Sequence, residues 1–282
     1  MSLACPTPAL LDGRERYLTD LVQMLPGTNV SRAIARTGPD WICVDTEHGN
    51  IADREMHECV AAIAACGVSP VVRIAANEAW MIKRALDAGA HGIVVPLLQT
   101  ADDAKRLVSS AKFPPRGTRG FGSPFSAEKF YTDSSGKLSQ TDYLQQANDA
   151  LVTIVQIETK EALANVKEIA EVEGVDVLLI GPFDLGNNIG YPIIESVHDE
   201  LKAAITKIHE AATQAGKHTG IYCTSGEQAR DYADKGFRFI SAVTDAAALP
   251  AACESAFKTA KGGYMHAAVR GVKEGVSKMT YS

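Results

Sequence analysis

The chain has 282 residues, 46% of them hydrophobic, and a formal net charge of −6. This length suits one large α/β domain as well as two small ones, and no linker favours two. The chain has no basic block, no apolar run longer than a strand and no signal-like N-terminus, so we expect a soluble, cytoplasmic protein without nucleic-acid or membrane partners.

Short apolar runs alternate with helical patterns along the chain. The predicted strands are residues 21–25, 41–45, 70–74, 92–96, 151–158, 177–181, 218–222 and 239–243. Continuous rather than alternating apolar runs are typical of parallel strands that are covered on both faces. Eight βα repeats predict a (β/α)8 TIM barrel in a single domain that spans residues 1–282.

Capping residues mark several of the intervening helices. The expected pairs of cap and helix are Asn77 with residues 78–88, Thr100 with residues 101–111, and Thr159 with residues 160–171. Gly89 is placed to end the first of these helices.

Two segments exceed what a barrel needs. Residues 113–150 join the fourth and fifth strands and include a short helix near residues 142–148, and a connection this long is typically functional or mobile. We interpret Arg119 as a buttress of this loop. Residues 251–282 form a helical extension, expected to pack on a neighbouring subunit.

Two carboxylates end the fifth and sixth strands. Glu158 and Asp184 are separated by 26 residues that contain one amphipathic helix, the spacing of neighbouring strands in a βαβ unit. The carboxyl ends of barrel strands meet at one rim, so both acids are aimed into one space. Close like charges are commonly bridged by a hard divalent cation with oxygen ligands.

Other polar groups end the second and third strands. A guanidinium at Arg73 would stabilise a developing oxyanion by roughly 1.5–3 kcal/mol. The alternative is a structural ion pair with Asp45 or Glu47. His48 is the best general acid–base candidate, because histidine is the side chain whose ordinary pKa lies nearest neutral pH. Glu47 is either an orienting group or a solvated acid.

Substrate-binding candidates flank the two acids. Gln156 lies on the same strand face as Glu158 and can hold a water molecule or the substrate. The backbone amides from Gly181 to Asp184 can receive a substrate carboxylate, although Pro182 supplies no N–H.

Five short motifs occur in a fixed order. They are Asp45-Thr-Glu47-His48-Gly49, Val72-Arg73-Ile74, Arg116-Gly-Thr-Arg119-Gly120, Gln156-Ile-Glu158 and Gly181-Pro-Phe-Asp184-Leu185. Together they resemble the HpcH/HpaI aldolase family of metal-dependent class II pyruvate aldolases, over about residues 20 to 250.

The resemblance implies a (β/α)8 barrel and a Mg²⁺, Mn²⁺ or Co²⁺ ion held by Glu158 and Asp184. It also implies an Asp45–His48 dyad, and a hexamer or trimer whose C-terminal helix is exchanged between subunits. Asp245 resembles a family acid that reaches an adjoining site, but by itself it is typical of a helix cap.

The implied reaction is cleavage of a 4-hydroxy-2-oxo acid to pyruvate and an aldehyde. A divalent ion would stabilise the pyruvate enolate, and a Schiff base is disfavoured because no strand ends on lysine. The same core would serve an oxaloacetate decarboxylase or a macrophomate synthase-like enzyme. Phe183 stands where the family commonly has a small residue, so the acceptor pocket is expected to be narrowed or reshaped.

Two other classes are weaker. A barrel that binds a metal and an oxo acid without turnover is disfavoured by the complete set of acids, Arg73 and His48. A phosphosugar enzyme would need a glycine-rich phosphate cradle after the last two strands, and residues 222–226 offer only a faint version of one.

Overall fold

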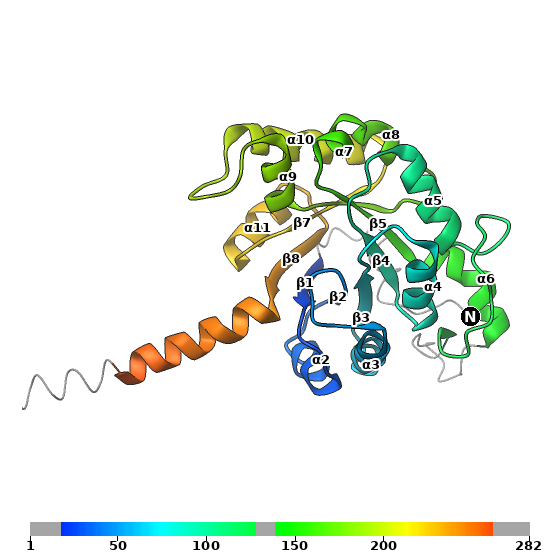
Figure 1. Ribbon diagram of the computed structural model, residues 1–282, viewed down its shortest axis with the longest axis horizontal. Helices are drawn as coiled ribbons and strands as arrows, with labels where there is room; N and C mark the ends of the chain where they lie inside the picture. Colours follow the sequence, from blue (N-terminus) through cyan, green and yellow to red (C-terminus); the bar gives the residue numbers. More distant parts are fainter. Residues whose placement is uncertain (1–17, 128–138, 262–282) are drawn as a thin grey trace, which may run out of the picture. The chain divides into compact units, whose positions relative to one another are not determined.

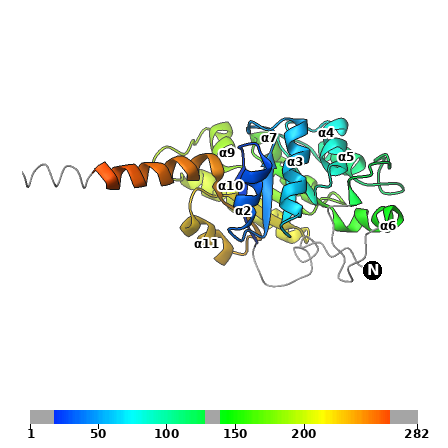
Figure 2. The ribbon, with the colours of Figure 1, turned by 90° about the horizontal axis from the view of Figure 1, so that it is seen from below.

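The computed structural model describes residues 18–127 and 139–261. It consists of two compact units, one that ends at Val243 and one that begins at Thr244. The first unit contains a closed barrel of parallel strands in the order β1 to β8, surrounded by helices (Figures 1 and 2). The predicted (β/α)8 barrel is therefore confirmed.

All eight predicted strands are present. They are β1 (Leu18–Gln23), β2 (Trp41–Asp45), β3 (Ser69–Arg73), β4 (Gly92–Val95), β5 (Val152–Ile157), β6 (Val177–Ile180), β7 (His218–Tyr222) and β8 (Phe239–Thr244). The largest shift from prediction is in β1, which begins three residues early because the Leu18 N–H donates to the Arg238 carbonyl at 2.8 Å and helps close the barrel.

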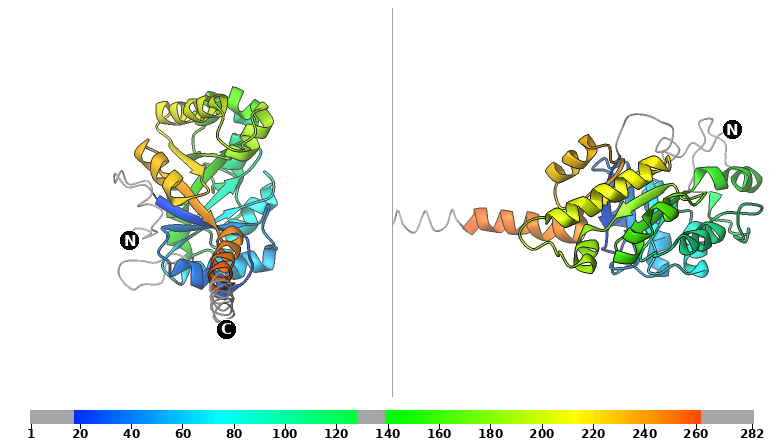
Figure 3. Two further views of the ribbon diagram at one scale, coloured as in Figure 1. Left: turned by 90° about the vertical axis from the view of Figure 1, so that its left-hand side faces the viewer. Right: turned by 90° about the horizontal axis from the view of Figure 1, so that it is seen from above.

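Helices cover the outer face of the sheet in both views of Figure 3. In the barrel unit they are α2 (Thr28–Ala35), α3 (Asp53–Ala64), α4 (Ala79–Asp87), α5 (Ala101–Ala111), α6 (Gln140–Ala150), α7 (Lys160–Ala164), α8 (Val166–Ala170), α9 (Pro182–Ile189), α10 (Asp199–Gln214) and α11 (Gly226–Asp234). No helix among the described residues is long and apolar enough to cross a membrane.

The predicted caps have different outcomes. Thr100 and Asp103 form a reciprocal capping box on α5, and the Thr159 hydroxyl accepts the Ala162 N–H as predicted. The predicted helix over residues 160–171 is instead interrupted at Asn165, between α7 and α8. The Asn77 prediction is wrong, because its amide donates to the Asp103 carbonyl and α4 starts one residue later than a cap at position 77 requires.

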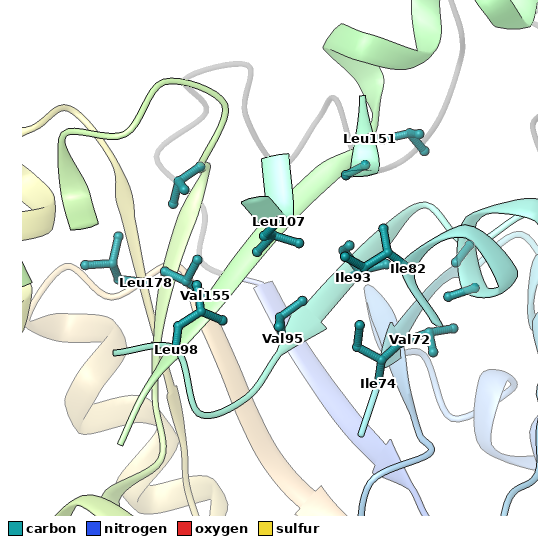
Figure 4. Packing of buried hydrophobic residues seen from close by; sticks show 14 of the residues in the cluster. Val72, Ile74, Ile82, Ile93, Val95, Leu98, Leu107, Leu151, Val155 and Leu178 are labelled. Atoms are coloured by element: carbon teal, nitrogen blue, oxygen red, sulfur yellow. The ribbon is translucent and has the colours of Figure 1, made fainter. Parts of the chain in front are cut away.

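The core has two layers that alternate along each strand. Ile42 and Val44 pack outward against the helices, whereas Trp41 and Cys43 belong to a cluster of strand residues that fills the barrel. Figure 4 shows part of the outer layer, with Ile82 of α4 beside Ile93 of β4.

One carboxyl group lies within the inner layer. Asp20 lies on the same face of β1 as the inward-facing Leu18 and Val22, and it is only 3% exposed. Neither of its oxygens has a hydrogen-bond partner of normal geometry among the described residues. Burial raises the pKa of Asp20 to about 7, against the opposing effects of nearby Ser241 and Arg73.

The described part of the long connection is anchored where the strands begin. Arg119 is buried, as predicted for a buttress, and pairs with Asp87 at 2.9 Å. Ser123 donates to the Asp87 carbonyl at 2.8 Å. Asp87 ends α4, which runs antiparallel to the strands, so this segment lies at the opposite end of the barrel from Glu158.

The second unit contains a helix over residues 245–261. The Thr244 hydroxyl accepts the Ala247 N–H at 3.2 Å and therefore caps this helix. Asp245 is the first helical residue, and its carboxylate accepts the Ala246 N–H at 2.7 Å, so the cap lies one residue before the predicted Asp245. Leu249 and Phe257 on this helix are more than half exposed. The single-domain assignment and the remainder of the 251–282 extension stay predictions, since residues 262–282 lie outside the described part.

Candidate active site

Glu158 is held rigidly just beyond the end of β5. Its side chain is almost fully buried, and its Oε1 accepts the backbone N–H of Leu97 at 2.8 Å. Its Oε2 accepts from Gln156 Nε2 at 2.5 Å, so the predicted same-face pair is in direct contact. Each carboxylate oxygen keeps a free lone-pair direction, and the orientation of the group is fixed.

Burial is the main reason that the pKa of Glu158 is raised. The hydrogen bonds from Gln156 and Leu97 oppose the rise, whereas the negative charge of Asp184 adds to it. The two strand-end acids therefore lie close enough to affect each other, as their spacing in the sequence predicts. A cation between them would relieve both the desolvation and the repulsion.

The end of β6 lies directly against Glu158. A Cβ at Gly181 would lie 3.0 Å from Glu158 Oε2 and 3.3 Å from Gln156 Nε2, so glycine keeps this side of the carboxylate open. Gly181 is the N-cap of α9, Pro182 is its first residue, and Asp184 lies exposed in its first turn. The N-terminal end of a helix favours negative charge, which suits a substrate carboxylate.

Arg73 binds Asp45 through both ends of its guanidinium fork. Nε donates to Oδ1 at 2.9 Å and Nη2 to Oδ2 at 2.6 Å, and Asp45 is fully buried. Nε also lies 3.3 Å from Glu47 Oε2. The structural ion pair that the sequence allowed is thus present, but a guanidinium has five N–H groups and the Asp45 pair occupies two of them.

The implied Asp45–His48 dyad is not formed by the side chains. Asp45 Oδ1 accepts the backbone N–H groups of Glu47 at 3.0 Å and His48 at 3.3 Å, while its carboxylate binds Arg73. The His48 ring instead has its Nε2 3.9 Å from Glu47 Oε2. An aspartate side chain commonly accepts hydrogen bonds from the backbone N–H groups two and three residues later. In this turn the His48 backbone N–H, and not its imidazole ring, therefore binds Asp45.

Glu47 is consequently the acid that faces His48. Burial raises the pKa of Glu47, the charges of Arg73 and His48 oppose that rise, and Glu158 and Asp45 add to it. Its Oε2 is buried without a hydrogen bond of normal geometry among the described residues. This oxygen can accept a proton or a hydrogen bond from a bound molecule.

The donor atoms at the rim fit a hard divalent cation. Glu158 and Asp184 supply carboxylate oxygens, and the Gln156 Oε1 is buried with no hydrogen-bond partner in the described part of the chain. Within residues 18–127 and 139–261, no group of three or more His, Cys, Asp and Glu side chains could hold a metal. An ion at this rim would therefore have few protein ligands, and positions would remain for substrate and water, as Mg²⁺ prefers.

Two features were not predicted from the sequence. The Leu97 N–H that holds Glu158 is a backbone donor, which leaves no signature in the residue types. Phe183 packs edge-on against Tyr222, the last residue of β7, with the ring centroids 6.1 Å apart. In contrast, Arg119 and Ser123 are at the other end of the barrel and do not join this site.

Residues 25–251 match the family model described as HpcH/HpaI aldolase/citrate lyase. The chain belongs to this family. This HpcH/HpaI chain is accordingly an enzyme of the aldolase and lyase class, and the resemblance in its motifs is confirmed.

Individual relatives of this HpcH/HpaI chain include aldolases. A hydroxypyruvate/pyruvate aldolase of Rhizorhabdus wittichii is 37% identical, with 84% of this chain and 91% of the relative covered. A 4-hydroxy-2-oxo-heptane-1,7-dioate aldolase of Shigella flexneri is 36% identical, with 79% and 80% covered. A family member from Burkholderia cenocepacia J2315, of known crystal structure, is 33% identical with a TM-score of 0.81, with 90% of this chain and 98% of that one covered.

Proposed function

We propose that the protein is a divalent-metal-dependent aldolase that cleaves a 4-hydroxy-2-oxo acid to pyruvate and an aldehyde. The observation that carries this proposal is the buried, doubly hydrogen-bonded Glu158 carboxylate beside Asp184. Relatives that are named as aldolases of pyruvate-type substrates support the same reaction class.

Glu158 and Asp184 would hold the ion, which we expect to be Mg²⁺, Mn²⁺ or Co²⁺. When bound, a divalent ion polarises the keto group and stabilises enolate charge by several kcal/mol. The N-terminal amides of α9 would receive the substrate carboxylate, and Gln156 would hold substrate or water through its unpartnered Oε1.

In the cleavage step, a base removes the proton from the C4 hydroxyl. The C3–C4 bond then breaks, the aldehyde leaves, and the bond's electron pair forms the enolate of pyruvate, which is protonated at C3. His48 is the proposed base, because its ring is largely exposed at the rim and Glu47 can balance the charge it gains. The N–H groups of Arg73 that are not bound to Asp45 would donate to the enolate oxygen.

The test is pyruvate release from a panel of 4-hydroxy-2-oxo acids, with and without EDTA and with Mg²⁺ or Mn²⁺ restored. Activity should vanish with the chelator and return with the metal. Activity that is unchanged by EDTA would refute the metal-dependent mechanism and leave only the family assignment.

Oxaloacetate decarboxylation is the second candidate, and a macrophomate synthase-like reaction starts from the same enolate. Oxaloacetate decarboxylation is favoured by the same arrangement of Glu158, Asp184 and Arg73, because this arrangement would stabilise an enolate whatever the leaving group is. Comparing the kcat/KM for oxaloacetate with that for the best 4-hydroxy-2-oxo acid decides between the two activities.

We further propose a homo-oligomer, a hexamer or trimer, in the cytoplasm, with the segment 251–282 packed on a neighbouring subunit. The exposed Leu249 and Phe257 support this, because apolar side chains on a helix commonly mark an interface. Light scattering of the full chain and of Phe257→Asp measures the assembly, and a monomeric full chain would contradict it.

A further inference from the structure

Two apolar side chains are exposed beside the proposed metal ligands. Phe183 immediately precedes Asp184 and is 41% exposed, with one edge against Tyr222. Leu97 is 58% exposed, and its own N–H holds Glu158. One large hydrocarbon group therefore accompanies each of the two acids.

The backbone of Leu97 gives a reason to assign its side chain a role. Its φ is +56°, and among the described residues it is the only non-glycine residue with a positive φ. This conformation strains any residue with a Cβ, and glycine would donate the same N–H to Glu158 without strain. A side chain that is mostly exposed adds little to the core, so leucine is best explained by contact with a bound molecule.

The charges at the rim point to the same kind of molecule. Arg73 is bound to Asp45 and Glu47, and its other N–H groups are assigned to the enolate oxygen, so it is not available to a second anionic group. An acceptor with a second anionic end would need a further cation. An uncharged hydrocarbon tail would instead bury apolar surface of Phe183 and Leu97.

We propose that the acceptor aldehyde has an uncharged hydrocarbon tail, aromatic for preference, and that Phe183 and Leu97 form its binding surface. This rests on the proposed aldolase function and names the second substrate of that site. In the synthetic direction, C3 of the pyruvate enolate forms a bond to the aldehyde carbon, and the carbonyl electron pair moves to oxygen, which takes a proton. The acceptor tail stays outside this bond change and contributes only binding.

The experiment compares benzaldehyde with succinic semialdehyde as acceptors for pyruvate, using the full chain with Mn²⁺. We expect a higher kcat/KM for benzaldehyde, and Phe183→Ala should lower it roughly 10- to 100-fold, the loss expected for one buried ring. Leu144→Ala is the matched control, because Leu144 is 37% exposed on α6, which leads into the start of β5. Leu97→Gly keeps the Glu158 hydrogen bond and should also lower the benzaldehyde kcat/KM, which tests the surface even if Phe183→Ala fails to fold.

A wild-type preference for succinic semialdehyde would overturn the inference, as would equal losses for both acceptors in Phe183→Ala and Leu97→Gly. A change in oligomer size with Phe183→Ala, at unchanged acceptor preference, would also overturn it by assigning the ring to a subunit contact. Deuterium exchange at the pyruvate methyl group distinguishes failure of this inference from failure of the proposed aldolase function. Exchange without the predicted preference leaves the proposed function standing, whereas no exchange and no product from either acceptor removes both.

Discussion

Replacing Asp20 with asparagine should change how the stability of the barrel depends on pH. Burial raises the pKa of Asp20 from 3.8 to about 7, and the opposing effects of Ser241 and Arg73 are smaller than that of burial. The charged and titratable groups around it are Arg73, which favours its ionised form, and the thiols of Cys43 and Cys223.

The sign follows from proton binding. Because the folded pKa exceeds the unfolded one, the folded state binds more protons between about pH 4 and pH 7. The contribution of Asp20 to the free energy of unfolding is therefore complete below about pH 4 and is lost as pH rises through about 7. A shift of about three units corresponds to roughly 4 kcal/mol in total, or about 1.4 kcal/mol per pH unit.

The assay is urea unfolding of wild type and Asp20→Asn at pH 5, 6, 7 and 8, at one protein concentration. Asparagine does not titrate, so the variant should gain about 1.4 kcal/mol relative to wild type for each pH unit up to 7 and little above it. Asp102→Asn, which removes an exposed carboxylate on α5, should show no such gain. A wild-type-to-Asp20→Asn difference that is constant with pH would refute the reasoning, because Asp20 would then titrate alike in both states.

Four further changes test the site and its scaffold. His48→Ala should lower aldol turnover by on the order of 10²–10⁴ while sparing oxaloacetate decarboxylation more, and equal losses would contradict its assignment to the acceptor half. Asp184→Ala should abolish Mn²⁺ binding measured by calorimetry; retained affinity would remove it as a ligand. Arg73→Lys keeps the charge but loses the fork, so kcat should fall about 10²–10³-fold, and a change in KM alone would argue against enolate contact. Thr100→Ala should lower the free energy of unfolding by about 1 kcal/mol in urea titrations, through loss of the α5 capping box.

The barrel could be predicted because its signals are local. A continuous apolar run such as residues 41–44 gives the strand directly, and the predicted strand 41–45 matches the observed bounds of β2. The start of β1 was missed because Thr19 and Asp20 break the apolar pattern, and only the closure of the barrel makes them strand residues. Asn77 was misassigned because its amide is used in a tertiary contact with Asp103.

The gathering of the candidate residues at one rim was predictable from the sequence, whereas their contacts were less so. Strand ends bring Glu158, Gln156 and Arg73 to one rim, so residue type and spacing suffice to find them. Which acid faces His48 depends on the turn after β2, whose backbone amides bind Asp45. Sequence spacing does not encode that choice.

The unequal count of charges at the rim has a consequence for the order of binding. Asp45, Glu47, Glu158 and Asp184 share this end of the barrel with Arg73, in a chain whose net charge is already −6. An arriving 2-oxo acid is itself an anion and is repelled by such a field, whereas a divalent cation is drawn in. We therefore expect the cation to bind first, and added salt to speed the capture of the oxo acid whenever the cation is scarce.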